Sequence, residues 1–199
     1  MNTILNKSAR VVSVLFHPLC MVLAGCVLIV ALTPGISARQ ITLFSLSLML
    51  SLFVIPLLFV PIVWLYAKIT QLEFSEKQKR LALLFPTSLV YFFTAYHVSA
   101  HNPLLLINAY IMACSVLMAL AFCVSIFWRI SLHAIGVGGF LALVIQLSVY
   151  EYFFAFTLIP AALVVAGLVL SARLYVQAHT VLQVLVGCAL GMAVVFFFT

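Results

Sequence analysis

Histidine, arginine and polar side chains gather in two short segments that are flanked by long apolar runs. The later segment holds Arg173, His179 and Gln183, and the earlier one holds Ser131 and His133. His179 and Gln183 are four residues apart, so on a helix they share a face and can contact each other. Two imidazoles and a guanidinium suit phosphoryl transfer: one imidazole attacks phosphorus, the other protonates the leaving oxygen, and the guanidinium holds the phosphate.

A third polar segment, 68–80, adds the cations Lys77, Lys79 and Arg80. A helix that begins beside Ser131 or His179 would add backbone N–H donors for an anion. Chemistry of this kind requires no metal and no cofactor. The five cysteines agree with that expectation, since they lie in apolar runs without a C-x-x-C pair and indicate no zinc site.

The composition places these segments in a membrane protein. Of 199 residues, 67% are hydrophobic and 6% are charged, whereas a soluble domain carries about 25% charged residues. A water-soluble fold could not bury so much apolar surface. The apolar runs do not alternate as barrel strands do, so we expect an all-α, polytopic transmembrane bundle, one domain over 1–199. Because the basic residues are dispersed, the net charge of +6 favours lipid headgroups over nucleic acid.

Runs long enough to cross a bilayer, about 20 residues each, predict seven helices. The second is long and carries Pro56 and Pro61, which should kink or tilt it. Glycines in the fifth and seventh helices, among them the Gly187-x3-Gly191 pair, should permit close helix packing. The predicted helices are 11–32, 40–67, 81–100, 103–127, 131–150, 152–172 and 179–198.

Seven crossings bring the N-terminus and segments 68–80, 128–131 and 172–178 to one face of the membrane, here called the polar side. It receives eight of the nine lysines and arginines, and Arg39 alone lies opposite. By the positive-inside rule the polar side is cytoplasmic, and the membrane is the inner, cytoplasmic one. The rule weakens if Lys77, Lys79, Arg80 and Arg173 serve a substrate. Without them, the polar side has four basic residues and the opposite side has one.

The spacing of the later segment resembles a known phosphatase motif. Arg173-x5-His179-x3-Gln183 is similar to the third motif of the type 2 phosphatidic acid phosphatase superfamily, S-R-x5-H-x3-D. The Ser131-x-His133 pair resembles the second motif of that superfamily, P-S-G-H. The order of the two motifs along the chain and their side of the membrane agree with the superfamily.

Two further features extend this resemblance. The basic segment 77–80 stands where the first motif, K-x6-R-P, would be. The His17-Pro18 pair and the Ile130 to Gly139 run resemble a compact seven-helix branch of the superfamily. A six-helix lipid-phosphatase-like core is the corresponding alternative for the fold.

The resemblance implies a role for each candidate residue. His179 would be the nucleophile that forms a phosphohistidine, Gln183 would orient it, and His133 would protonate the leaving group. The substrate would be a lipid phosphate or a prenyl diphosphate that enters from the bilayer. Four side chains would hold its phosphate: Arg173, Arg80, Lys77 and Ser131.

Gln183 keeps a second interpretation open. The superfamily has a carboxylate at this position, and a neutral amide orients a histidine without adding charge. The chain is then either a phosphatase or a non-catalytic protein of the same fold that binds lipid phosphate. A small transporter is the third alternative, although the spans carry few polar residues and no evident repeat. If there is no site, Arg173 and His179 are interfacial anchors.

The sequence also leaves two alternatives for the membrane face that carries the candidate site. Bacterial members of the superfamily usually work on the outer face of the cytoplasmic membrane, whereas the charge count here puts the polar side inside. His17 lies near the polar side, where it either packs between helices or supports the site.

Overall fold

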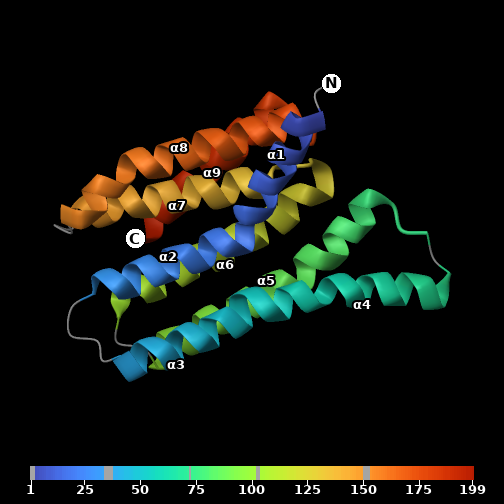
Figure 1. Cartoon of the computed structure of the whole chain (residues 1–199). Coiled ribbons are helices and arrows are strands. Elements are labelled where there is room, and N and C mark those ends of the chain that lie inside the picture. The colour runs from blue at the N-terminus through green and yellow to red at the C-terminus, as the bar shows by residue number, and fades with distance from the viewer. Residues whose placement is uncertain (1–2, 34–37, 72, 102–103, 150–152) are drawn as a thin grey trace.

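The computed structural model describes residues 3–33, 38–71, 73–101, 104–149 and 153–199, and the regular elements within them are helices. Figure 1 shows these helices running between two opposite ends of a bundle. The described part contains six helices long and apolar enough to cross a membrane, and the bent pair formed by α1 and α2 makes a seventh if the two helices are one broken span. The prediction of an all-α polytopic bundle is confirmed.

The observed helices follow the predicted ones within a few residues, except in the first span. In chain order they are α1 (Thr3–Leu15), α2 (Pro18–Leu32), α3 (Ala38–Met49), the π-helical turn η1 (Leu50–Val54), α4 (Ile55–Thr70), α5 (Glu76–His101), α6 (Leu105–Phe127), α7 (Leu132–Val149), α8 (Phe153–Tyr175) and α9 (Val181–Phe198).

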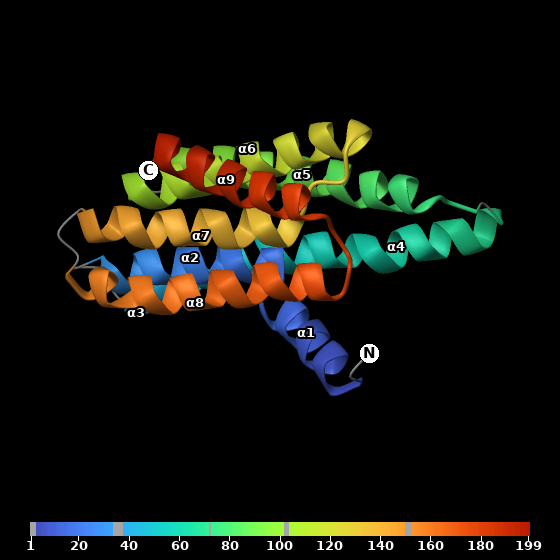
Figure 2. The ribbon, with the colours of Figure 1, turned by 90° about the horizontal axis from the view of Figure 1, so that it is seen from above.

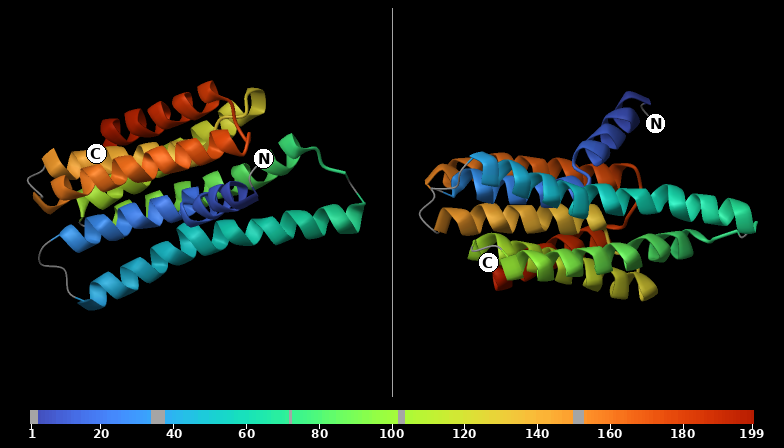
Figure 3. Two further views of the ribbon diagram at one scale, coloured as in Figure 1. Left: turned by 45° about the horizontal axis from the view of Figure 1, so that its top comes forward. Right: turned by 90° about the horizontal axis from the view of Figure 1, so that it is seen from below.

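The first span is bent, which corrects the prediction of one helix over 11–32. Its two halves, α1 and α2, meet at an angle of 48°, and α1 points away from the bundle (Figure 3). The break lies at His17, which has extended backbone angles and precedes Pro18. Proline lacks an N–H and disfavours helical angles in the residue before it. The Nδ1 atom of His17 then accepts from the Leu19 N–H at 3.3 Å and caps α2.

The second span contains a π-helical turn near its first proline, where the sequence predicts a kink or tilt. The π-helical turn η1 ends just before Pro56. In a regular helix residue 56 would donate its N–H to the Leu52 carbonyl, and proline has no N–H. The buried Tyr91 of α5 donates its hydroxyl to that carbonyl at 3.1 Å instead.

Helix α7 is the centre of the bundle and packs against α9, α8 and α2. Figure 2 shows it running between α8 and α9. The α7 and α9 backbones touch through glycine: a Cβ added to Gly191 would overlap the Ile135 carbonyl, and one added to Gly138 would overlap Cys188. The predicted close packing at these glycines is confirmed. As a result, the first residues of α7 and α9 lie side by side.

The polar segments meet at one end of the bundle. The N-terminus and the α4–α5, α6–α7 and α8–α9 junctions lie at the right-hand end of Figure 1, and the C-terminus lies at the opposite end. The described candidate residues near 131, 173 and 179 therefore belong to one end, as the crossing count predicts.

Candidate functional site

His179 lies in the segment between α8 and α9, directly before the residue that caps α9. Its Nδ1 is 3.1 Å from the Gln183 Oε1 atom. The same Oε1 accepts the Thr180 N–H at 3.1 Å, while the Thr180 hydroxyl accepts the Gln183 N–H. Thr180 and Gln183 thus form a capping box, a reciprocal arrangement that fixes the first turn of α9. The predicted contact between His179 and Gln183 is confirmed.

This capping box determines which nitrogen of His179 carries a proton. A backbone N–H needs an acceptor, so the Gln183 atom facing Thr180 is the carbonyl oxygen. That oxygen can only accept, and therefore Nδ1 of His179 is the donor in the second contact. In the neutral ring, Nε2 then holds the lone pair. This is the tautomer that a nucleophilic histidine requires.

Ser131 joins the beginnings of α7 and α9. Its N–H donates to the Gln183 carbonyl at 3.4 Å, and its Oγ accepts from the Ala134 N–H at 3.3 Å as the N-cap of α7. The Ser131 residue is fully buried. Its observed contacts are structural ones that join the first turns of α7 and α9, and a hydrogen bond from Ser131 to a phosphate stays a prediction.

Arg80 links α5 to the same region. Its Nε donates to the Ser125 Oγ at 3.1 Å and its Nη2 donates to the Ile130 carbonyl. These two bonds hold the first turns of α5 against the end of α6 and the segment that leads into α7. Lys77 lies exposed one turn earlier, beside the exposed ion pair between Lys79 and Glu76, whose Nζ and Oε1 atoms are 2.8 Å apart.

His133 points from α7 toward α1 and the bend that follows it. Its Nε2 lies 2.9 Å from the Ser13 carbonyl oxygen, so Nε2 carries the proton of this hydrogen bond. The His17 ring meets the His133 ring edge-on, with centroids 5.7 Å apart. His17 therefore contacts a candidate site residue directly, which favours the supporting role over helix packing alone.

Arg173, in the last turn of α8, contacts the same residue of α1. Its Nη1 donates to the Ser13 Oγ at 3.3 Å. Its Nε is buried and has no hydrogen-bond partner within the described residues. Buried guanidinium nitrogens are normally paired, so this donor is available to an anion.

Burial and the positive charges of nearby arginines both affect the pKa of His179. Its pKa is lowered from the ordinary 6.5, chiefly because it is half-buried, and the nearby guanidinium groups of Arg173, Arg80 and Arg129 lower it further. The hydrogen bond to Gln183 acts in the opposite direction. His133 in turn lies within electrostatic range of Arg173 and His179. Three arginines thus lie within electrostatic range of His179, and positive charge at such a position is suited to an anion.

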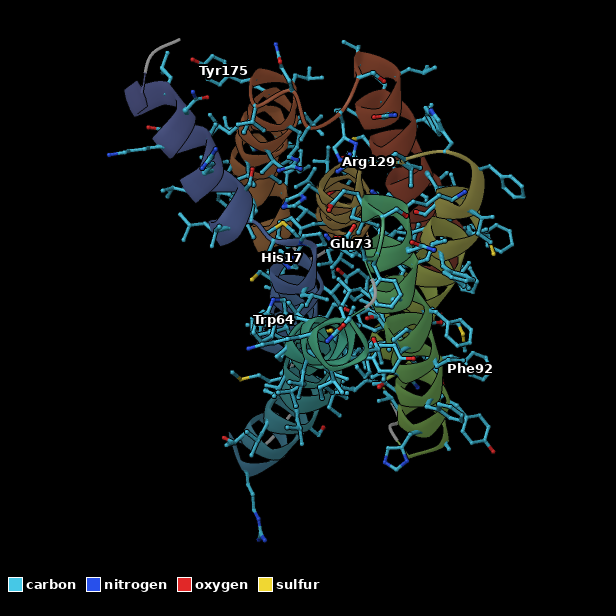
Figure 4. All side chains as sticks on the ribbon, turned by 90° about the vertical axis from the view of Figure 1, so that its right-hand side faces the viewer. His17, Trp64, Glu73, Phe92, Arg129 and Tyr175 are labelled. Carbon is cyan, nitrogen blue, oxygen red and sulfur yellow. The ribbon has the colours of Figure 1, made fainter. Side chains whose placement is uncertain are left out.

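Two residues of this region are absent from the sequence-based candidates. Arg129 lies near the centre of this end in Figure 4 and acts electrostatically on His179, Arg80 and Arg173. Its position two residues before Ser131, on the polar side, was a usable signal. Ser13 gave no such signal, because a serine within an apolar run most often serves its own helix.

No protein-family model, curated protein or solved structure matches this chain. The assignment of a function therefore depends on the residues and their geometry.

Proposed function

We propose that this multi-pass membrane protein binds a lipid phosphate or prenyl diphosphate at the polar side and hydrolyses it through a phosphohistidine on His179. The observation that carries the proposal is the hydrogen bond from His179 Nδ1 to Gln183, which leaves Nε2 with a lone pair. Burial and three nearby arginines also keep the ring neutral, because they lower its pKa. An unprotonated imidazole beside guanidinium groups is matched to attack on a phosphate.

The proposed reaction has two steps. His179 Nε2 forms a bond to phosphorus while the bond from phosphorus to the lipid or bridging oxygen breaks, and His133, in its imidazolium form, gives its Nε2 proton to that oxygen and becomes neutral. Water then attacks the phosphohistidine: its oxygen bonds to phosphorus as the bond between phosphorus and His179 Nε2 breaks, and the neutral His133 takes the proton. This releases inorganic phosphate and restores both histidines.

The two arginines have different proposed roles in binding the phosphate. Arg173 has a buried, unpartnered Nε and would bind a phosphate oxygen directly. Arg80 already uses two donors to hold Ser125 and Ile130, so it would supply charge and position the α7 end. Lys77 and the Ser131 hydroxyl are the remaining proposed contacts to the phosphate.

One observation favours the non-catalytic alternative. The Gln183 amide gives His179 an oriented hydrogen bond but no negative charge to stabilise the cationic phosphohistidine. A chain that binds the phosphate and never releases it would fit that feature. For location we propose the inner, cytoplasmic membrane, on the basis of the excess of basic residues at the polar side.

Three purified proteins test the proposal: the wild type, His179→Ala, and His97→Ala. His97 is an exposed histidine near the other end of α5 and serves as the matched control. Phosphate release is measured from phosphatidic acid, phosphatidylglycerol phosphate and undecaprenyl diphosphate. We expect release by the wild type and His97→Ala and none by His179→Ala. Binding without release supports the non-catalytic alternative. If the wild type neither binds these lipids nor releases phosphate from them, the phosphate site is rejected.

A further inference from the structure

Ser13 of α1 touches both a proposed acid and a proposed phosphate ligand. Its carbonyl oxygen accepts from His133 Nε2 at 2.9 Å, and its hydroxyl accepts from Arg173 Nη1 at 3.3 Å. The hydroxyl also donates to the Ala9 carbonyl at 2.9 Å, which fixes its orientation. Ser13 is buried, with 8% of its surface exposed.

These two donors are the ones a phosphoryl group would need. His133 Nε2–H is the proton proposed for the leaving oxygen, and the Arg173 guanidinium is the proposed ligand of a second oxygen. Each hydrogen that points at Ser13 cannot point at a phosphate at the same time. Ser13 therefore occupies the His133 donor and one of the Arg173 donors, and the Nε of Arg173 is left without a partner among the described residues.

We propose that α1 is a cover over the phosphate site, held closed by Ser13, and that a lipid phosphate displaces it. The inference rests on the proposed function, because it identifies the site that the cover closes. Closure keeps water and unbound anions away from His133 and Arg173 until a lipid headgroup competes for the same donors.

The way α1 is attached suits such a movement. It joins α2 at the 48° bend before Pro18, where the hydrogen-bond ladder is already interrupted. It packs against α8, with Val12 and Phe16 against the small cluster that contains Ala166 and Val169. A helix with few buried contacts opens at a small cost in free energy.

The outward face of α1 has side chains that can bind the membrane surface when the helix opens. Lys7 and Arg10 are exposed, and four apolar side chains are at least half exposed: Leu5, Val11, Val14 and Leu15. A basic, amphipathic helix of this kind lies in the interface of an anionic bilayer, with its apolar side chains in lipid and its cations at the headgroups.

Cysteine labelling at position 13 tests the movement. Ser13→Cys keeps the backbone carbonyl and a side chain of similar size, and Val14→Cys is the control because residue 14 is 72% exposed. Each full-length variant is placed in phosphatidylcholine nanodiscs with or without a non-hydrolysable phosphonate analogue of phosphatidic acid. Maleimide modification is quantified on the peptide that carries the residue, so the native cysteines do not interfere.

We expect the new thiol of the Ser13→Cys variant to be protected in phosphatidylcholine and to be modified at least several-fold faster with the phosphonate. The thiol of the Val14→Cys variant should react no faster with the phosphonate than without it, because residue 14 is exposed while α1 is closed. If the phosphonate binds while the thiol at position 13 stays protected, the cover is rejected and the phosphate site stands. If the phosphonate does not bind at all, both the cover and the proposed function are rejected.

A second variant tests the competition by affinity. Ser13→Ala removes the oxygen that accepts from Arg173 and keeps the carbonyl that accepts from His133, so the closed state loses one of its two bonds. We expect the phosphonate to bind about 3- to 10-fold more tightly. Binding requires α1 to open, so any free energy that the closed state loses lowers the cost of opening and adds to the observed affinity. Ser8→Ala, an exposed serine on α1, is the matched control. Equal or weaker binding by Ser13→Ala overturns the proposal.

Discussion

Gln183 holds His179 in one tautomer, with the His179 Nδ1 3.1 Å from the Gln183 Oε1 and the same oxygen accepting the Thr180 N–H. The capping box at the start of α9 and the orientation of the proposed nucleophile are therefore one structure. A change at position 183 alters both the helix cap and the imidazole.

The first prediction concerns charge at this position. Gln183→Glu keeps the length of the side chain and the cap, and adds a negative charge that raises the lowered pKa of His179. The reactive neutral ring is lost as the pH falls through this pKa, so loss begins at a higher pH in the variant. We expect the acid limb of the pH–rate profile, and the NMR titration of His179, to move upward. Because a carboxylate stabilises the phosphohistidine, activity should stay equal or rise.

The matched control is Gln183→Leu, which loses the side-chain bonds to the Thr180 N–H and to His179 but keeps the bond from its own backbone N–H to the Thr180 hydroxyl. Loss of these side-chain bonds should cost about 0.5–1.5 kcal/mol of stability for each bond, and activity should fall at every pH. An unchanged acid limb in Gln183→Glu would show that His179 does not set the rate.

The second prediction concerns the glycine contact that holds α9 against α7. A side chain at Gly191 would overlap the Ile135 carbonyl, so Gly191→Val must push α9 away from α7. We expect a loss of roughly 1–3 kcal/mol in stability together with a loss of activity. Gly167→Ala is the control, because a Cβ there meets no atom within 4 Å; it should leave the melting temperature equal or higher. Equal melting of Gly191→Val and wild type would contradict the close contact.

The third prediction concerns Arg129, which lies at the site although it belongs to none of the matched motifs. It acts on His179 through charge and is exposed. Arg129→Gln should weaken binding of the phosphonate by about 3- to 10-fold, the range of a charge-assisted contact, and reduce the dependence of binding on salt. Arg39→Gln removes an equally exposed arginine from the opposite end. An equal loss in both variants would indicate a general effect of net charge.

Several of these features follow from local sequence. The length and hydropathy of the apolar runs predict the spans, and the Gly187-x3-Gly191 spacing predicts close packing of the last helix, because both depend on residues within one helix. The identity of the partner, α7, comes from the structure. The four-residue spacing of His179 and Gln183 also predicts their contact, although the capping role of Gln183 was not recognised. The signal for it was present, since Thr180 and Gln183 have the spacing of a capping box.

The position of α1 could not be obtained in this way. Ser13 meets His133 and Arg173 across 120 and 160 residues of sequence, and nothing near residue 13 marks a partner. The break before Pro18 was readable from the proline, but the apolar run across it favoured one helix. Ser131 was expected to donate to phosphate because it lies beside His133, and its burial as the α7 cap depends on the packing of α9.

The fourth prediction concerns the π-helical turn of the second span. Tyr91 donates to the Leu52 carbonyl, whose usual helical donor is missing because residue 56 is proline. Both Tyr91 and Leu52 are fully buried, so in Tyr91→Phe that carbonyl loses a partner in an apolar interior. We expect Tyr91→Phe to lower stability by about 1–3 kcal/mol, measured as unfolding in detergent.

Pro56→Ala supplies the missing N–H and allows a regular turn to form. In that background Tyr91→Phe should cost clearly less than it does in the wild type, since the Leu52 carbonyl then has a backbone donor. The control background is Pro61→Ala, an exposed proline of the same helix, in which the full cost should remain. Equal costs in all three backgrounds would mean that Tyr91 stabilises the bundle through packing alone, and that the π-helical turn does not depend on the hydroxyl. The double-mutant cycle separates these two cases because each single substitution is measured alongside the pair.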